Sequence, residues 1–143
     1  MPFRLSKQFR FESSHRLPHH DGKCARLHGH SWVGTAHVHG SGLHAKGPRA
    51  GMVEDFGVIG RAVKELTERH LDHYHLNDSL GIESPTSEQV AVFCYDWLCT
   101  HYPLIEWAGV DIEETCTSRC EYRPAGGPHR PVAALALASE KEC

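Results

Sequence analysis

The feature that most restricts how this chain can fold is the alternating segment at residues 28–39, which carries histidines on its apolar side. His28 and His30 share the parity of Trp32, so the pattern predicts a strand with both imidazoles on the buried face. His15 lies a short way upstream. Each histidine alone is most simply a surface or hydrogen-bonded side chain, but burying several is costly unless their nitrogens are bonded. The set predicts a three-histidine zinc site with one open coordination position, as catalytic zinc sites have.

Length and composition are those of one globular domain. The chain has 143 residues, of which 40% are hydrophobic and 23% charged, with a formal net charge of -3. Its basic residues form no long run, which disfavours nucleic acid as a partner. There is no apolar signal segment and no apolar run of bilayer length, so we expect no membrane partner and a cytoplasmic location. The six cysteines are expected to be thiols, because disulfide frameworks are typical of small secreted proteins.

Periodicity predicts four strands. Apolar residues alternate over residues 3–12, and a polar loop at residues 13–23 is expected to carry His15 at or near its start. After the strand at residues 28–39, the glycine-rich residues 40–51 are expected to form a long connection with little order. Further strands are expected over residues 110–115 and around Tyr122, with a turn around Ser118 and Arg119 between them.

Two helices are predicted between these pairs of strands. Asp55 is placed to cap a helix that fades near His70, and Thr86 to cap a second helix that Pro103 ends. The order ββααββ predicts an α+β fold in which a four-stranded antiparallel sheet carries both helices on one face. Residues 1–124 would form the single domain, and residues 125–143 a C-terminal tail of uncertain order.

Two positions could move protons. Cys24 lies in a polar loop beside Arg26 and four residues before His28; a lone cysteine is more often a small core residue, but this setting favours the thiolate, which can act as a base. Asp72 and His73 follow the first helix and could form an acid/base pair in which the carboxylate orients the imidazole. A polar helix end with histidines favoured by the helix dipole fits the same spacing equally well.

Glu114 is the most informative carboxylate. It shares strand parity with Val110 and Ile112, so it should point to the apolar side, where an unpaired charge is expensive. Either the alternating pattern ends before it, or Glu114 meets a partner. A ligand with adjacent amino and ring N–H donors would pair with it through both oxygens.

Taken together, these residues resemble the family of 6-pyruvoyl-tetrahydropterin synthases and 6-carboxytetrahydropterin synthases. The motifs that carry the resemblance are His15 in Ser-Ser-His-Arg-Leu, Cys24 with His28-Gly-His30, Met52-Val-Glu-Asp-Phe56, Leu71-Asp-His73, Pro85-Thr-Ser-Glu88 and Glu114-Thr-Cys-Thr117. The three residues between Cys24 and His28, and the run Glu-Thr-Cys-Thr-Ser-Arg-Cys-Glu-Tyr at residues 114–122, are similar to the bacterial 6-carboxytetrahydropterin synthase branch of the queuosine pathway. A second histidine, His75, stands close to His73 and could be mistaken for it.

The resemblance implies a fold, an assembly and a set of roles. The family has the tunnelling fold, in which small subunits join their sheets into a barrel, commonly as hexamers, with active sites at subunit interfaces. By resemblance, His15, His28 and His30 bind zinc, Cys24 is the catalytic base, Asp72 and His73 form its partner acid/base pair, and Glu114 anchors the pterin. Lys23, Arg26 and Arg49 are candidates for holding phosphates.

The implied reaction is a carbon–carbon lyase reaction. It converts 7,8-dihydroneopterin triphosphate to 6-carboxy-5,6,7,8-tetrahydropterin, acetaldehyde and triphosphate, in queuosine or other 7-deazapurine biosynthesis. A 6-pyruvoyl-type synthase or another pterin side-chain lyase is the alternative that keeps the fold. A zinc- or pterin-binding module without catalysis is disfavoured, because binding does not require Cys24, Asp72 and His73 together.

Overall fold

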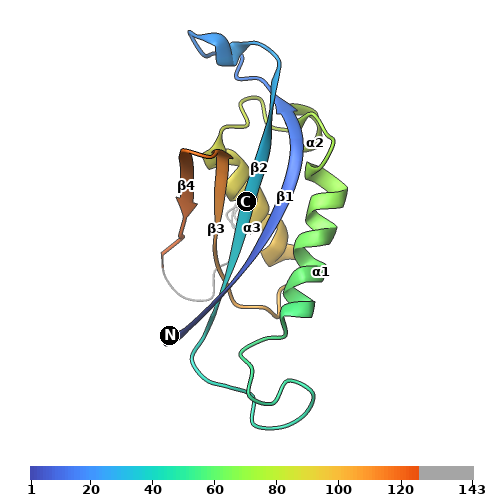
Figure 1. Ribbon diagram of the computed structural model, residues 1–143, viewed down its shortest axis with the longest axis vertical. Coiled ribbons are helices and arrows are strands. Elements are labelled where there is room, and N and C mark those ends of the chain that lie inside the picture. Colours follow the sequence, from blue (N-terminus) through green and yellow to red (C-terminus); the bar gives the residue numbers. More distant parts are fainter. Residues whose placement is uncertain (126–143) are drawn as a thin grey trace, which may run out of the picture.

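The computed structural model describes residues 1–125 and shows a four-stranded antiparallel sheet with the strand order β1-β2-β3-β4 (Figure 1). The strands are β1 (Phe3–His15), β2 (His28–Gly40), β3 (Trp107–Thr115) and β4 (Ser118–Tyr122). The helices α1 (Phe56–Leu66) and α3 (Ser87–His101) lie on one face of this sheet. The predicted α+β class and the order of the main elements are therefore confirmed. The division into a domain at 1–124 and a tail at 125–143 stays a prediction, because residues 126–143 lie outside the described part.

The inner face of the sheet is apolar up to the point where the histidines begin. The register pairs Phe11 with Trp32 and His15 with His28, so alternate residues of β1 and β2 face the helices together. The rings of Phe11 and Trp32 stack with their centroids 5.6 Å apart, and each is 1% exposed. Buried aromatic pairs of this kind contribute strongly to a core. The histidines thus continue the row of core residues, with His15 buried and His28 and His30 half-buried.

Both long helices begin at the capping residues that the sequence predicts. The side chains of Asp55 and Thr86 each accept a backbone N–H group from the first turn of their helix. Helix α1 continues into a π-helical turn (Thr67–Leu71), which ends beside Asp72. A short helix, α2 (Leu76–Ser79), follows and was not predicted, because four residues are too few to give a periodic pattern. Together the turn and α2 bring residues 72–77 against the end of β1.

The predicted boundary of the first strand is wrong. The expected loop starts at Ser13, whereas β1 continues through Ser13 and ends with His15. Both residues still pair with β2, and both side chains are buried. In a sequence, polar residues at the end of a strand look like a loop. Here their backbones pair with β2, and their side chains form hydrogen bonds with the carbonyls of Leu71 and Pro85, which lie beyond α1.

The last hairpin also differs from the prediction. β3 begins at Trp107 instead of Val110, because Gly109 lies inside the strand and does not end it. A Cβ atom on Gly109 would lie 2.3 Å from the carbonyl oxygen of Tyr122, so a glycine is needed where the two backbones approach so closely. The turn lies at residues 116–117, ahead of Ser118, which already belongs to β4.

The connection at residues 40–51 is irregular, as predicted, but it is not without order. His44 and Met52 are joined by a backbone hydrogen bond of 3.0 Å, and Gly51 donates to the His44 carbonyl at 2.8 Å. Figure 1 places this connection at the opposite end of the molecule from the loop between β1 and β2. None of the helices in residues 1–125 is long and apolar enough to cross a membrane.

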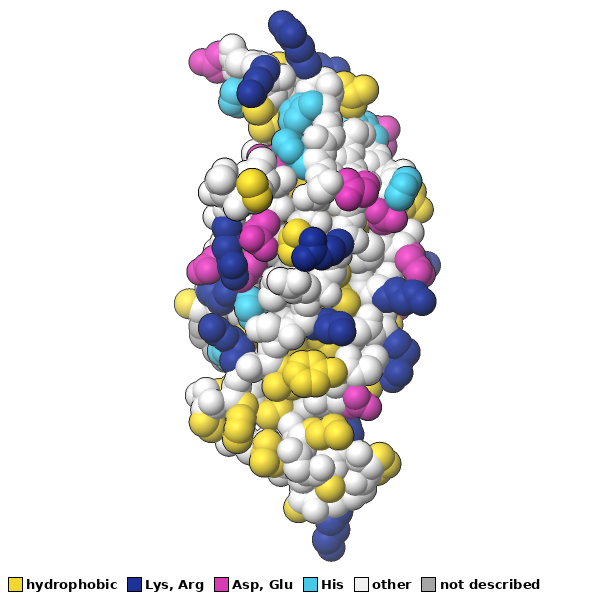
Figure 2. Space-filling model, viewed as in Figure 1, with side chains coloured by type: hydrophobic (Ala, Val, Ile, Leu, Met, Phe, Trp, Pro, Cys, Tyr) yellow, Lys and Arg dark blue, Asp and Glu magenta, His cyan; other side chains and the backbone are white. Residues whose placement is uncertain are grey.

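The outer face of the sheet is polar, and Figure 2 shows basic and acidic side chains interspersed over it. At its centre the carboxylate of buried Asp111 binds His37 Nε2 at 2.9 Å, Arg119 at 2.5 Å and also Arg123. The Ser6 hydroxyl lies 2.8 Å from the other ring nitrogen of His37. These groups come from all four strands and from the residue after β4, so no local sequence pattern could have revealed the network.

Candidate metal centre and active site

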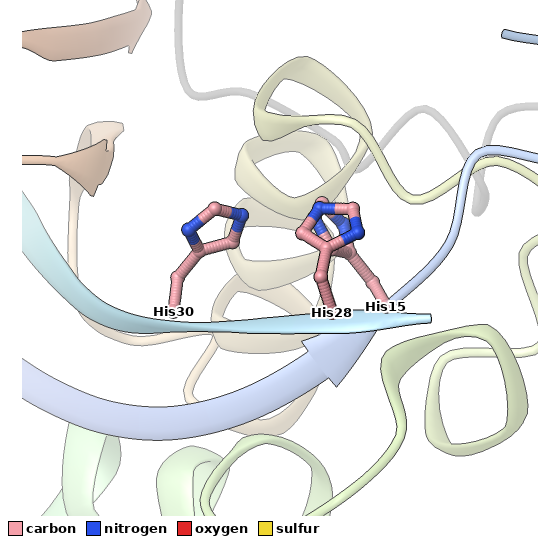
Figure 3. A group of neighbouring side chains, drawn as sticks. All are labelled: His15, His28 and His30. Atoms are coloured by element: carbon pink, nitrogen blue, oxygen red, sulfur yellow. The ribbon is translucent and has the colours of Figure 1, made fainter. Parts of the chain in front are cut away.

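Three histidines meet where β1 ends and β2 begins. His15 is the last residue of β1, and His28 and His30 lie at the start of β2, opposite it in the antiparallel pair. All three rings project from the same side of the two strands (Figure 3), and each offers a nitrogen within 4.8 Å of those of the other two. The strand parity expected for His28 and His30 is thus confirmed, and the register brings in His15.

Backbone carbonyls fix which nitrogen of two of these rings is protonated. His15 Nδ1 lies 2.9 Å from the Pro85 carbonyl oxygen, and His28 Nδ1 lies 2.7 Å from that of Arg26. A carbonyl only accepts, so each Nδ1 carries the proton and donates it, which leaves Nε2 with its lone pair. This is the outer-shell arrangement that orients metal-binding histidines.

The remaining nitrogens fit a metal ion. The Nε2 atoms of His15 and His30 are buried and have no hydrogen-bond partner among the described residues. Burial lowers the pKa of both side chains, with nearby Glu114 acting in the opposite direction. Burial therefore favours the neutral imidazole in both rings, and this is the form that binds metal. Two buried nitrogens without a partner would be costly in the absence of a ligand.

Glu114 lies beside this cluster. Its Oε1 is 3.4 Å from His15 Nε2 and 3.6 Å from His30 Nε2, and its side chain is 28% exposed. Strand parity predicted either that the alternating pattern ends before Glu114 or that this carboxylate faces the inner side and meets a partner, and these distances support the second alternative. The partners within the chain are the histidines, and the partly exposed carboxylate remains accessible to a ligand.

Asp72 and His73 form a hydrogen-bonded pair. Asp72 Oδ2 lies 2.8 Å from His73 Nδ1, and the other carboxylate oxygen accepts the backbone N–H of Glu12 at 2.9 Å. The hydrogen bond from Glu12 is the main cause that lowers the pKa of Asp72, with a further contribution from His73. His75 is not part of the pair, since its Nδ1 lies 3.0 Å from the Ser14 hydroxyl.

His73 has an unusual backbone and is open to solvent. Its φ is 64°, in the left-handed region that few residues other than glycine adopt, and its side chain is 80% exposed. Strain of this kind collects at functional sites. An open pocket of about 490 Å3 is lined by His73, His75 and His30, among others. His73 and one metal-site histidine thus border one pocket, of a size common for small ligands.

Cys24 lies in the connection between β1 and β2, in a short 3-10 helix (Lys23–Ala25) that precedes His28. It is half-buried, and its carbonyl accepts the N–H of Leu17 at 2.8 Å. The described residues show no hydrogen bond from the Cys24 thiol to the histidines or to Asp72. The structure therefore brings His15, His28, His30 and Glu114 together and pairs Asp72 with His73, while Cys24 stands on its own turn beside the metal-site strands.

Sequence reasoning missed the groups that support these residues. Pro85 and Arg26 act through their backbone carbonyls. Every residue has such a group, so the residue types in the sequence could not indicate this role. Asn77, whose amide bonds to three backbone groups, was also missed. An asparagine soon after a histidine-rich helix end is a weak signal, because the same residue is common in ordinary turns.

Comparisons with known proteins cover nearly all of the described residues. The family model for 6-pyruvoyl tetrahydropterin synthase matches residues 4–125. The chain belongs to this family. The resemblance noted in the sequence motifs is thus confirmed for the 6-pyruvoyl tetrahydropterin synthase family as a whole.

Relatives within the 6-pyruvoyl tetrahydropterin synthase family carry a more specific name. A Synechocystis protein named 6-carboxy-5,6,7,8-tetrahydropterin synthase is 48% identical over 124 residues, covering 82% of this chain and 91% of the relative. A Haemophilus influenzae protein of the same name is 30% identical over 141 residues, covering 85% and 99%. The structure of Caenorhabditis elegans 6-pyruvoyl tetrahydropterin synthase superposes with a TM-score of 0.73 at 24% identity, covering 86% of this chain and 96% of that one, which supports the fold.

Proposed function

We propose that this protein is a zinc-dependent 6-carboxy-5,6,7,8-tetrahydropterin synthase. The observation that carries the proposal is the 48% identity, over most of both chains, to a Synechocystis protein of that name. The reaction would convert 7,8-dihydroneopterin triphosphate to 6-carboxy-5,6,7,8-tetrahydropterin, acetaldehyde and triphosphate. The product would serve the biosynthesis of queuosine or of another 7-deazapurine, in the cytoplasm.

His15, His28 and His30 would hold the zinc ion. The cluster suits it because Nδ1 of His15 and His28 is committed to backbone carbonyls, and the buried Nε2 atoms of His15 and His30 lack other partners. Three imidazoles leave one position for substrate, as in catalytic zinc sites. When bound, zinc would supply Lewis-acid chemistry to the side-chain hydroxyls of the substrate.

Cys24, Asp72 and His73 would move protons. The low pKa of Asp72 keeps its carboxylate ionised, so it holds the Nδ1 proton of His73 and leaves Nε2 to accept or release a proton. The side chain of His73 is 80% exposed, so its ring is accessible to a ligand. Cys24 would act as the base at a side-chain carbon, from the turn that leads into the metal-site strand.

Glu114 would anchor the pterin ring. A carboxylate accepts two parallel hydrogen bonds from a ligand that presents an amino group and a ring N–H side by side. The position of Glu114 beside His15 and His30 supports this role, since the ring would lie next to the metal-bound side chain.

Among the candidate phosphate ligands, Lys23 and Arg26 are favoured over Arg49. Lys23 and Arg26 flank Cys24 in the connection between β1 and β2. Arg49 lies in the connection after β2, at the opposite end of the molecule, and is paired with the carboxylate of Glu54 at 3.0 Å. Replacing Lys23 or Arg26 would therefore be expected to raise KM more than replacing Arg49.

A homo-oligomer with active sites at subunit interfaces is part of the proposal. β1 and β4 are the edge strands of the sheet, so their outer edges can pair with further copies and join the sheets into a barrel, as a hexamer. The polar outer face would suit the inside of such a barrel (Figure 2). Mixing subunits inactivated by Cys24→Ala with subunits inactivated by His73→Ala tests the arrangement. Recovered activity supports shared sites, whereas none after proven subunit exchange contradicts them.

Product identification tests the function itself. The zinc-loaded protein is incubated with 7,8-dihydroneopterin triphosphate, the pterin is analysed by mass spectrometry and acetaldehyde is trapped with a hydrazine. The carboxy product with one equivalent of acetaldehyde is expected. A pterin that retains all its side-chain carbons would contradict the proposal and favour a 6-pyruvoyl-type synthase, and zinc binding without turnover would favour a binding module.

A further inference from the structure

The side-chain amide of Asn77 makes three hydrogen bonds, all of them to the backbone. Its Oδ1 accepts the N–H of Arg16 at 3.0 Å, and its Nδ2 donates to the carbonyls of Arg16 and Glu83, each at 2.9 Å. An asparagine amide has two N–H donors and one carbonyl acceptor, so both ends are occupied. Among natural side chains of this length only an amide offers both kinds of group.

These bonds fix His15 from two sides. Arg16 directly follows His15, so the amide fastens the end of β1 just beyond this residue. Glu83 stands two residues before Pro85, whose carbonyl accepts the Nδ1 proton of His15. The strand that carries the imidazole and the segment that orients it are therefore tied to one side chain.

The same amide also lies between the other two segments of this chain that carry proposed catalytic residues. Leu17, the neighbour of Arg16, donates its N–H to the Cys24 carbonyl at 2.8 Å. On the other side, Asn77 belongs to α2, which directly follows residues 72–75, and the N–H of Ser14 donates to the Tyr74 carbonyl at 3.2 Å. Asn77 thus stands between the turn that holds Cys24 and the segment that holds the Asp72–His73 pair.

We propose that Asn77 is a positioning residue that sets the orientation of His15 and the placement of the Cys24 turn. This inference rests on the proposed zinc site. The hydrogen bonds of the Asn77 amide go to the backbone of residues 16 and 83, so Asn77 acts through these two segments. Outer-shell groups that orient a histidine ligand typically change metal affinity by about ten- to a hundredfold when removed.

The test compares Asn77→Ala with Ser79→Ala. Ser79 lies in the same short helix and donates one hydrogen bond of 2.7 Å to the His70 carbonyl, away from the metal site, so its loss controls for destabilisation of α2. Zinc affinity is measured by competition with a chromophoric chelator, and the ligand geometry by the visible absorption of Co2+-substituted protein. Asn77→Ala is expected to weaken zinc binding about tenfold or more and to alter the Co2+ bands. Ser79→Ala should leave both as in the wild type.

The outcomes separate this inference from the proposed function. If the wild type binds zinc tightly and Asn77→Ala binds it equally well with an unchanged Co2+ spectrum, the positioning role is wrong while the zinc site stands. Equal weakening by Ser79→Ala would also overturn it, because α2 stability would then be the cause. If the wild type binds no zinc, the metal site itself fails. Should Asn77→Ala not fold, Asn77→Asp keeps the acceptor for Arg16 and loses both donors; wild-type affinity in that variant would refute the role.

Discussion

Replacing Asp111 with asparagine tests the buried network on the outer face of the sheet. The Asp111 carboxylate is fully buried and binds His37, Arg119 and Arg123. Asparagine has nearly the same shape but no charge, and its NH2 group would face donors. The substitution therefore removes the charge while it leaves the packing almost unchanged.

The pKa of Asp111 sets the size of the effect. Burial by itself raises this pKa, but hydrogen bonds from Arg123, His37 and Arg119 together lower it from 3.8 to about 2. One pKa unit corresponds to about 1.4 kcal/mol, so the ionised carboxylate stabilises the folded state by about 2 kcal/mol. Because the folded pKa lies below the unfolded one, this contribution is present above about pH 4 and disappears as the pH falls towards 2.

Urea denaturation of the metal-free protein, followed by tryptophan fluorescence at constant protein concentration, measures the difference. Asp111→Asn should lose about 2 kcal/mol at pH 7 and progressively less below pH 4. Glu121→Gln is the matched control, because Glu121 lies 3.5 Å from the same Arg119 but is 58% exposed, and exposed pairs contribute about 1 kcal/mol or less. Equal losses in the two variants, or a loss for Asp111→Asn that does not depend on pH, would refute the reasoning.

Three predictions concern the proposed reaction. Cys24→Ala should lower kcat by about a hundredfold or more, as loss of a general base does, with the zinc content unchanged; full activity would exclude Cys24 as the base. His73→Ala should lower kcat much more than His75→Ala, because His73 is the partner of Asp72; equal effects in steady-state assays would contradict the dyad. Glu114→Gln should raise KM more than it lowers kcat, since an amide meets the ring donors with only one acceptor, and an unchanged KM would count against the anchor.

The sequence predicted the local parts of the fold well. Alternation placed His28, His30 and Trp32 on one face of a strand, and Asp55 and Thr86 marked the starts of the helices. These features depend on residues close together in the chain, so periodicity and capping are enough to reveal them. Where a polar stretch pairs with distant segments, as at the end of β1, the same reasoning ended the strand too early.

The residue types of the candidate site were also visible, but their arrangement was not. Two histidines follow Asp72 within three positions, and spacing could not decide between them. The structure decides for His73, because its ring bonds to Asp72 while His75 bonds to Ser14. Which histidine pairs with Asp72 depends on the tertiary contacts that hold residues 72–75 against β1.

By itself the sequence determined that His28 and His30 would share the inner face of a strand, because side chains of a strand alternate with a period of two. Only the tertiary structure decided which ring nitrogens bond to the backbone and which remain available to a metal ion. The register of β1 against β2 brings His15 opposite His28, and the carbonyl of Pro85, seventy residues along the chain, fixes the ring of His15. Backbone carbonyls are alike in every residue, so their role emerges only when the fold places them.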